Sequence, residues 1–427
     1  MGIRRGILWF RNDLRLHDNE ALTEIMRSVD EIIPVFVFDD RLFRGKMFDI
    51  LPKIYKTRAL FTIESVRDLR MNLKNQGSNL VVRKGLTEDI IFDLAKEFRS
   101  SWVFCNRERT EDEVCVQDSL EESLWTIGQE IRYSRGKMLH YTQDLPFPIT
   151  HSPDLFATFR KETERIVDIR EPLPSPQRIK PLLSDIEEGP IPDLKEFGWD
   201  NDYVNVGFKG GETEALKVSW EHISEVKNKE RKHLELSPWL SNGALSPKLL
   251  YERINGLPRS LKKIKKELIR NLYLRDFHRL MGKKHYNKLF LKGGFSEADE
   301  SETDGDWNFE KLQQWICGNT EHKLVNAAMK ALAQTGYLSH QYRRVVAYYL
   351  IETMNVHWLL GAAYFESVLL DYDPCSNYGN WQRIVGVSLD QKGEVGVNFD
   401  TVDQLLDPEG KFKSQWCSHT VDYNIEF

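Results

Sequence analysis

The sequence predicts a doubly wound α/β domain followed by an all-helical domain, and three observations lead to this expectation. Over the first 135 residues, short apolar runs alternate with amphipathic stretches, as in parallel strands joined by helices. Nine prolines then fall between residues 146 and 192, where they leave little room for long regular elements. From Glu212 to about Leu370, apolar residues recur at helical spacing. We therefore expect an α/β domain over 1–135, a proline-rich linker over 136–211 and a helical domain over 212–427.

The α/β prediction rests on specific segments. The apolar runs expected to form buried parallel strands are 6–10, 31–38, 79–83 and 101–105. The stretches between and after them that carry apolar residues at helical spacing are 19–28, 56–76, 87–98 and 111–128. A core-facing stripe is sufficient to explain the spacing of the apolar residues in these helices.

Composition excludes several classes of protein. The chain has 427 residues and a formal charge of −6, with 41% hydrophobic and 29% charged residues, which is typical of a globular chain and not of a disordered one. Its five cysteines are scattered and form no CxxC pair, which argues against a disulfide framework and against a zinc site. We expect a cytoplasmic protein with no signal peptide, no membrane span and no metal.

Two features of the sequence indicate which classes of ligand the protein could bind. The first strand runs into FRNDLR in place of a glycine-rich turn, so a dinucleotide-binding oxidoreductase loses its main support. Segment 259–292 holds twelve Lys or Arg against two acidic residues, interleaved with four aromatic residues. This composition suits phosphate neutralisation with base stacking. A solvated helix face explains it equally well.

Polar residues also gather near the end of the helical region. Asp371, Asp373 and Asn377 lie close together after a long apolar stretch, and Arg343 lies one long helix earlier. An arginine and a carboxylate in such positions can pin two helices together and leave a second acid and a carboxamide for a ligand. Tryptophan is also concentrated here, since eight of the eleven follow residue 198. Taken alone, the tryptophans of this region are explained by a packed core.

Four motifs together resemble the photolyase/cryptochrome superfamily, and most closely its cryptochrome-DASH branch. They are ILWFRNDLRLHDNEAL at the start, DLPFPITHSPDLFATFRKETE over 144–164, LSPWLSNGALSP over 236–247 and YFESVLLDYDPCSNYGNW over 364–381. The resemblance covers nearly the whole chain in the right order. It implies an antenna-binding α/β domain and a helical domain that binds FAD.

The resemblance also implies roles for individual residues. Asn377 matches the asparagine that faces the flavin N5, while Arg343 and Asp371 match the salt bridge beside the flavin ring. The remaining positions that match FAD contacts are Asp373, Ser237 and Arg275. Trp381, Trp358 and Trp315 match the chain that carries an electron from the surface to the flavin.

The sequence departs from the family where lesion-containing DNA is bound. Asn271 replaces a glutamate that hydrogen-bonds the lesion, and Leu274 replaces a tryptophan that stacks on it. His340 stands at an active-site asparagine and Gln341 at an arginine. A histidine at position 340 matches the catalytic histidine of photolyases for the pyrimidone photoproduct, where it is a candidate general acid. Glu108 lies near the residues with which DASH proteins contact a methenyltetrahydrofolate antenna.

Three functional hypotheses follow. The first is FAD-dependent, blue-light-driven repair of cyclobutane pyrimidine dimers, the reaction of a deoxyribodipyrimidine photolyase, in single-stranded DNA, from which a lesion is more easily extruded. The second is a blue-light photoreceptor without repair activity that acts through a signalling partner, which the changes at Asn271, Leu274 and His340 favour. The third is a DNA-binding protein without a working flavin, suggested by His233 and Leu234 at positions that usually donate hydroxyl groups to the FAD phosphates.

Overall fold

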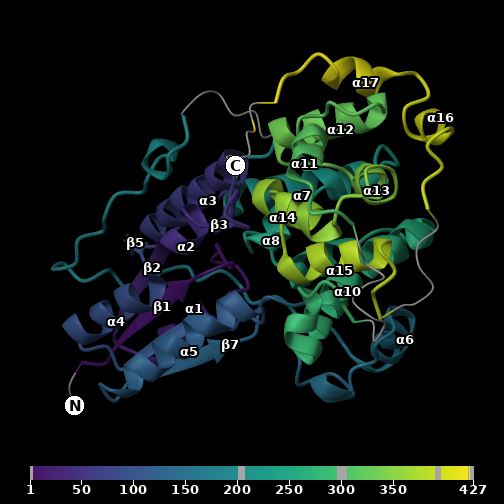
Figure 1. Ribbon diagram of the computed structural model, residues 1–427. Helices are drawn as coiled ribbons and strands as arrows, with labels where there is room; N and C mark the ends of the chain where they lie inside the picture. The colour runs from purple at the N-terminus through teal and green to yellow at the C-terminus, as the bar shows by residue number, and fades with distance from the viewer. Residues whose placement is uncertain (1–2, 201–206, 296–304, 390–395, 422, 424–427) are drawn as a thin grey trace. The chain divides into compact units, whose positions relative to one another are not determined.

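The computed structural model describes residues 3–200, 207–295, 305–389, 396–421 and 423 (Figure 1). The chain divides into two compact units, each built from separate stretches of sequence. The first contains Met1–Leu42, Leu60–Glu196 and Phe208–Lys284, and the second contains Phe43–Ala59, Phe197–Gly207 and His285–Phe427.

A five-stranded parallel sheet forms the centre of the first unit. Its strands are β1 (Arg5–Phe10), β2 (Glu31–Asp39), β5 (Val81–Gly85), β6 (Trp102–Asn106) and β7 (Glu130–Ser134). They lie in the order β5-β2-β1-β6-β7, and Ile7 of β1 pairs with Ile33 on one side and Val103 on the other. The order reverses beside β1, which confirms the doubly wound arrangement.

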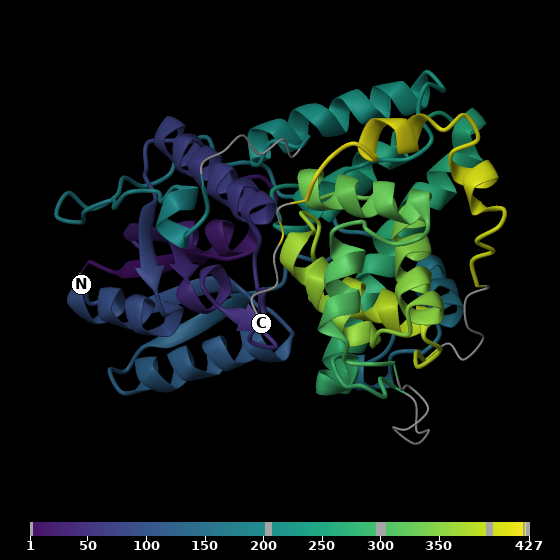
Figure 2. The same cartoon turned by 45° about the horizontal axis from the view of Figure 1, so that its top comes forward.

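Helices cover both faces of this sheet (Figure 2). Because parallel crossovers are right-handed, α1 (Glu20–Ser28) and α3 (Lys56–Asn75) lie on one face, and α4 (Thr87–Glu97) and α5 (Glu111–Trp125) lie on the other. Gly6 allows α1 to approach closely, because a Cβ there would lie 3.1 Å from side-chain atoms of Ile25 and of Val29. On the opposite face, Ile7 and Ile33 pack with residues of α4 and α5 in one buried cluster.

The four predicted strands and the four predicted helices all occur, with ends that shift by no more than three residues. Strand β7 was not predicted. It lies at the edge of the sheet and contains only two apolar residues, Ile131 and Tyr133, so it lacks the continuous apolar run of the central strands. The proline-rich span also contains an eleven-residue helix, α6 (Phe156–Ile166), which lies in the proline-free interval between Pro153 and Pro172.

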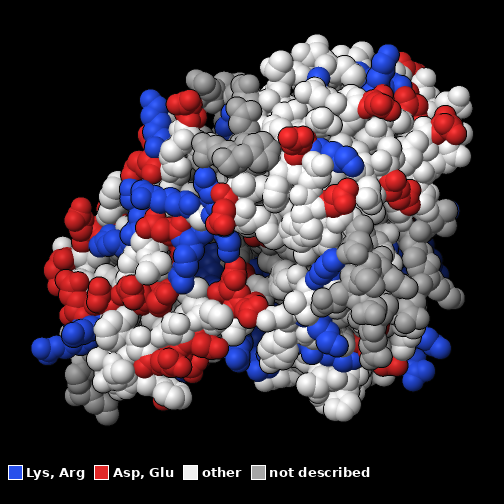
Figure 3. Space-filling view, in the orientation of Figure 1, with Lys and Arg blue, Asp and Glu red and all other residues white. Residues whose placement is uncertain are grey.

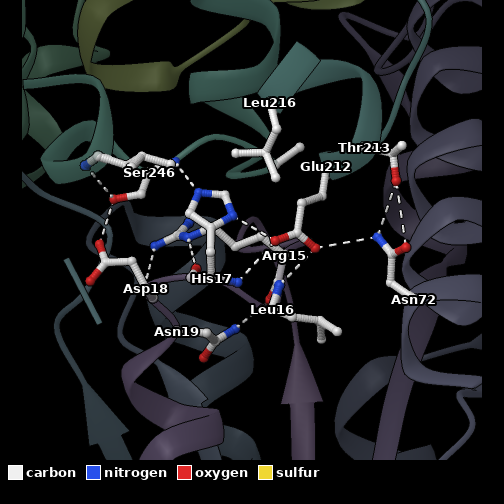
Figure 4. Close-up of polar contacts among 12 residues, drawn as sticks. Arg15, Leu16, His17, Asp18, Asn19, Asn72, Glu212, Thr213, Leu216 and Ser246 are labelled. Carbon is white, nitrogen blue, oxygen red and sulfur yellow. Dashed lines mark hydrogen bonds and ion pairs between the residues drawn. The ribbon is translucent and has the colours of Figure 1, made fainter. Parts of the chain in front are cut away.

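The first unit includes further helices in addition to those that cover the sheet. They are α7 (Glu212–Lys227), α8 (Ser237–Ser241), α9 (Pro247–Asn255) and α10 (Lys262–His285). A buried polar network joins two of these helices to the segment that follows β1 (Figure 4). The motif residues Arg15, His17 and Asp18 of that segment form its centre.

His17 and Glu212 form the principal pair of the network. Backbone N–H groups of Leu16 and His17 donate to the Glu212 carboxylate at 3.0 and 2.9 Å, and Nδ1 of His17 lies 2.5 Å from the same carboxylate. The backbone N–H of Ser246 donates to His17 Nε2 at 3.1 Å, so Nδ1 carries the ring proton that Glu212 accepts. Burial opposes ionisation of Glu212, but the hydrogen bonds from His17 and Leu16 outweigh it and lower the pKa of this carboxyl.

Arg15 and Asp18 complete the network. The Arg15 guanidinium donates to backbone oxygens of His17, Asp18, Gly136 and Gly243. Asp18 accepts from the Ser246 hydroxyl and lies 2.8 Å from the Lys248 ammonium. The segment after β1 is therefore fixed to the starts of α7 and α9, which shows what the FRNDLRLHDN motif does in the fold.

The second unit is mostly helical. Its helices are α11 (Phe309–Ile316), α12 (Lys323–Thr335), α13 (His340–Tyr348), α14 (Trp358–Val368), α15 (Pro374–Ile384), α16 (Val402–Leu406) and α17 (Lys411–Trp416), and a π-helical turn, Tyr349–Thr353, extends α13. A short hairpin of β3 (Lys46–Met47) and β4 (Leu51–Pro52) also belongs to it. Its core contains Trp315, Trp358 and Trp381, so the tryptophans singled out in the sequence lie in one apolar cluster.

Candidate flavin and DNA sites

Arg343 and Asp371 form a bidentate ion pair in the second unit. The guanidinium Nη2 of Arg343 lies 2.9 and 2.8 Å from the two carboxylate oxygens, and its Nε donates to the Leu338 carbonyl at 2.6 Å. The Asp371 side chain is buried and that of Arg343 is mostly buried. The ion pair therefore links α13 to the segment between α14 and α15, as the sequence pattern predicts.

Asp373 and Asn377 lie at the start of α15. Oδ1 of Asp373 accepts from the backbone N–H and the hydroxyl of Ser376, at 3.0 and 2.9 Å, so this carboxylate caps its own helix. Asn377 is buried, and its Nδ2 donates to the Ala362 carbonyl at 3.0 Å. That bond fixes the orientation of the amide and leaves Oδ1 as the atom with which Asn377 can accept a hydrogen bond from a ligand.

The charged residues of the expected flavin site have partners within the protein. A buried arginine, two carboxylates and an oriented carboxamide come together on α13 and at the start of α15, and the carboxylates already have partners. The Arg343–Asp371 pair is neutral as a unit, and the start of α15 stabilises the charge of Asp373, so both carboxylates have partners before any ligand binds.

Ser237 and Arg275 lie in the first unit. Ser237 is the partly exposed first residue of α8. Arg275, on α10, donates to the backbone oxygens of Lys137 and Leu240 at 2.9 and 3.0 Å. Through these two hydrogen bonds, Arg275 joins α10 to the end of α8 and to the segment that follows β7.

The three predicted electron-transfer tryptophans are all buried. Trp381 contacts Phe365, with ring centroids 5.2 Å apart, and Phe365 in turn lies 6.1 Å from Trp315. Trp358 donates through Nε1 to the Lys292 carbonyl at 3.2 Å. Trp315 is 0% exposed, so this residue does not itself reach solvent.

Trp307 was not singled out from the sequence, yet it has the exposure that the outer end of such a chain needs. Its side chain is 44% exposed, and its ring stacks on His357 with centroids 4.7 Å apart and planes 17° apart. The His357 ring lies 6.2 Å from that of Trp358, at 24°. The three rings form a stack that extends from the surface to Trp358. In the sequence Trp307 follows two acidic residues, Asp304 and Asp306, and nothing in this local pattern predicts the stacking.

The residues predicted to meet DNA are largely accessible. On α10, Asn271 is exposed and Leu274 is partly exposed, and their spacing of three places them on one face of the helix. His340 and Gln341 are exposed in the first turn of α13. Asn271 and Leu274 belong to the first unit, and His340 and Gln341 to the second.

The basic segment 259–292 combines core and surface positions. Of its four aromatic residues, Tyr273 and Phe277 are buried, Phe290 is partly buried and Tyr286 is 69% exposed. Only Tyr286 is therefore well exposed as a stacking surface. In Figure 3, basic and acidic side chains intermingle over the α/β part, so the face shown there has no broad basic patch.

Glu108, the predicted antenna contact, is buried in an internal ion pair. Its carboxylate pairs with the Lys137 ammonium and accepts from Asn12 Nδ2 at 3.3 Å. Burial alone would raise its pKa, but Lys137, Arg279 and Arg11 outweigh burial and lower the pKa. Glu108 is thus a carboxylate already held by cations of the first unit.

Among the residues that the structure describes, no helix is both long enough and apolar enough to span a bilayer. The same residues contain no group of three or more His, Cys, Asp or Glu side chains arranged to hold a metal ion.

Comparison with known proteins identifies the family. Residues 6–177 match the model of DNA photolyase, and residues 268–426 match that of the FAD binding domain of DNA photolyase. The chain is 34% identical to cryptochrome DASH of Gloeobacter violaceus over 97% of this chain and 86% of that protein. It is 33% identical to the chloroplastic/mitochondrial cryptochrome DASH of Arabidopsis thaliana over 96% of this chain and 75% of that protein.

Solved structures agree with this assignment. The crystal structure of a Synechocystis cryptochrome superposes with a TM-score of 0.89 at 32% identity, covering 97% of this chain and 89% of that one. An archaeal photolyase from Sulfolobus tokodaii, described with two FAD molecules, superposes with a TM-score of 0.81 at 26% identity, covering 97% and 90%. With its two photolyase domains and its nearly full-length DASH relatives, this chain belongs to the photolyase/cryptochrome family, among the cryptochrome DASH proteins.

Proposed function

We propose that this protein binds FAD and uses blue light to split cyclobutane pyrimidine dimers, with single-stranded DNA as its substrate. The main support is that the positions that match flavin contacts in the family are largely buried on α13 and around the start of α15, where Arg343 pairs with Asp371, Asp373 caps its helix and Asn377 is oriented by Ala362. When bound, FAD supplies the photoexcited electron donor. Arg343, Asp371, Asp373 and Asn377 would hold it; the Arg343–Asp371 pair fixes α13 to the segment before α15, and the oriented amide of Asn377 would offer Oδ1 as an acceptor.

The electron route to the flavin also belongs to this proposal. Trp381 and Trp358 remain its inner members. We place its outer end at Trp307, because Trp307 is exposed and stacks through His357 towards Trp358, whereas Trp315 is enclosed. Trp315 then serves as part of the core that contacts Trp381 through Phe365.

DNA binding is proposed from accessible positions in each unit separately, on α10 in the first and on α13 in the second. Asn271 and Leu274 lack the carboxylate and the indole found at these positions elsewhere in the family, and loss of one stacking surface costs about 1–3 kcal/mol of binding. We therefore expect weak lesion affinity, together with a preference for single strands, from which a dimer is extruded at lower cost.

The decisive experiment is a repair assay on a dimer-containing oligonucleotide. The protein is loaded with fully reduced FAD and illuminated with blue light, and restoration of the pyrimidines is followed by absorbance in single-stranded and in duplex substrates. Repair restricted to single strands supports the proposal. If bound flavin is present and photochemically active but no dimer is split in either substrate, the protein is not a photolyase.

The changed residues Asn271, Leu274 and His340 favour a second candidate, a blue-light photoreceptor that does not repair DNA. It requires flavin photoreduction but no lesion binding, and it acts through a signalling partner. Photoreduction without repair, together with a light-dependent change in protease sensitivity, supports this alternative.

A methenyltetrahydrofolate antenna is also part of the proposal, with Glu108 as its expected contact. Because Lys137 already pairs with Glu108, the pterin has to share or displace that ammonium. Addition of the pterin to the flavin-loaded protein, followed by near-ultraviolet excitation and flavin emission, tests whether energy is transferred.

A further inference from the structure

Tyr378, on α15, lies between a tryptophan of the electron route and a carboxylate. Its ring lies edge to face with that of Trp358, with centroids 6.3 Å apart and planes at 75°. Its hydroxyl donates to Oε2 of Glu366 on α14 at 3.1 Å. Tyr378 is buried and also packs against Phe290, with centroids 4.8 Å apart. A phenol is therefore held between a redox-active ring and a proton acceptor.

Glu366 is suited to receive a proton. Burial raises the pKa of this carboxyl, although hydrogen bonds from Tyr372 and Tyr378 and the charge of Arg58 oppose the effect. A base whose pKa has moved up towards neutrality accepts a proton more readily than an ordinary exposed glutamate does. The hydrogen bond from Tyr378 also means that the proton has only one short step to make.

The second phenol at Glu366 provides an internal comparison. Tyr372 also donates to Glu366, but the Arg58 guanidinium lies over its ring, 4.6 Å from the centroid. Arg58 is held there by its bonds to the backbone oxygens of Lys53 and Glu366. A fixed positive charge on a ring opposes removal of an electron from that ring. Of the two phenols, Tyr378 is therefore the one that loses an electron more easily.

We propose that Tyr378 and Glu366 form a proton-coupled redox site that fills the electron vacancy left on Trp358. This inference rests on the flavin photoreduction included in the proposed function. When Trp358 has given up an electron towards the photoexcited flavin, one electron moves from the Tyr378 ring to Trp358. In the same step the O–H bond of Tyr378 breaks, and its proton bonds to Oε2 of Glu366.

The step balances in electrons and in charge. The tryptophan radical cation, the phenol and the carboxylate become a neutral tryptophan, a neutral tyrosyl radical and a neutral carboxylic acid. Because the products carry no separated charges within this buried cluster, the oxidised state outlives that of Trp358 alone. In the dark the electron returns to Tyr378 and the proton returns from Glu366.

The first test follows radicals in the FAD-loaded protein under blue light. Electron paramagnetic resonance is recorded on protein labelled with ring-deuterated tyrosine, so that tyrosyl and tryptophanyl signals are separated. We expect a tyrosyl signal in the wild type, its loss in Tyr378→Phe and its retention in the matched control Tyr372→Phe. In Glu366→Gln, transient absorption is expected to show radical formation about 10²-fold slower, at the low end of what a positioned general base contributes.

The second test does not depend on the flavin. Azide radicals generated by pulse radiolysis oxidise tryptophans in the dark, and the exposed Trp307 is an accessible target. We expect part of the tryptophanyl absorption to convert into tyrosyl absorption in the wild type and in Tyr372→Phe, and this part to be missing in Tyr378→Phe. Thermal unfolding of each variant, followed by circular dichroism, establishes that it is folded.

The two tests separate the inference from the function on which it rests. If light produces no radical but the azide experiment shows the difference at Tyr378, the flavin proposal fails and the redox site is retained. If Tyr378→Phe converts tryptophanyl to tyrosyl radicals as fast as the wild type, the redox site is ruled out, whatever the flavin does.

Discussion

The guanidinium of Arg343 contacts both carboxylate oxygens of Asp371, at 2.9 and 2.8 Å, and thereby links α13 to the segment before α15. Arg343 lies 28 residues before Asp371 in the sequence. Because the Asp371 side chain is buried, its removal leaves a charged guanidinium without its partner inside the protein.

Asp371→Asn is therefore expected to lower the free energy of unfolding by about 3 kcal/mol, as measured by urea denaturation of the protein without FAD. The matched control is Asp400→Asn at an exposed position, for which we expect a change within about 0.5 kcal/mol. If the two variants unfold alike, the ion pair contributes no stability.

The Glu212 carboxyl makes the free energy of unfolding vary with pH in the acid range. Its pKa in the folded protein lies below the ordinary value of 4.5, so the stabilisation is fully present above that value and is lost as the pH falls through the lower, folded pKa. In Glu212→Gln, the free energy of unfolding should decrease less as the pH is lowered. Urea titrations between neutral and strongly acidic pH measure this decrease. Glu221→Gln, at an exposed position on the same helix, should leave the decrease unchanged.

Trp307 should control the entry of electrons. Trp307→Phe is expected to slow photoreduction of bound FAD by an external reductant about tenfold, which corresponds to about 1.4 kcal/mol in the barrier. Trp315→Phe, which changes an enclosed ring, should change that rate much less. If photoreduction is slowed more in Trp315→Phe than in Trp307→Phe, Trp315 is the outer end of the electron route.

The lesion-binding positions on α10 can be restored. The double variant Asn271→Glu, Leu274→Trp should strengthen binding of a dimer-containing oligonucleotide by about 1–3 kcal/mol, because it regains a stacking surface. Fluorescence anisotropy measures the affinity, and Asn255→Glu, which adds the same charge at an exposed site on α9, serves as the control. Equal affinity of the double variant and the wild type would show that α10 does not contact the lesion.

Gly361 should be intolerant of a side chain. A Cβ at this position would lie 2.3 Å from a ring carbon of Trp381 and 2.6 Å from Leu350, so Gly361→Ala is expected to displace the indole and cost about 1–3 kcal/mol of stability. Tryptophan fluorescence and thermal unfolding report the displacement. Gly386→Ala tests a glycine with a positive φ and open space around it, and an equal loss of indole packing in both variants would contradict this explanation.

The parts of the fold that the sequence predicted are those with a strong local signal. The central strands carry uninterrupted apolar runs because helices cover both of their faces, and these runs are readable without a structure. The edge strand β7 is only partly buried, so the sequence of its five residues does not differ clearly from that of a loop. The pairing of Arg343 with Asp371 could be predicted from the sequence, because a charged side chain in an apolar region is stabilised by a partner of opposite charge.

The parts that were missed depend on contacts between distant segments. Trp307 and Trp315 are eight residues apart and chemically identical, and only the packed structure shows that one is exposed and the other enclosed. Arg58 reaches Tyr372 from more than 300 residues away in the sequence, so no local pattern places a cation on that ring. Exposure and long-range stacking therefore distinguish the roles of residues that look equivalent in sequence.

The buried network around His17 has a consequence for synthesis of the chain. The carboxylate that His17 needs belongs to residue 212, and the serine that donates to its ring belongs to residue 246. A ribosome that has made only the sheet and its helices has therefore not yet supplied Glu212, Ser246 and Lys248 for His17 and Asp18, nor the Gly243 oxygen for Arg15. We therefore expect the α/β region to remain incompletely folded until α9 has emerged from the ribosome. Nascent chains that end before α9 should be sensitive to proteolysis.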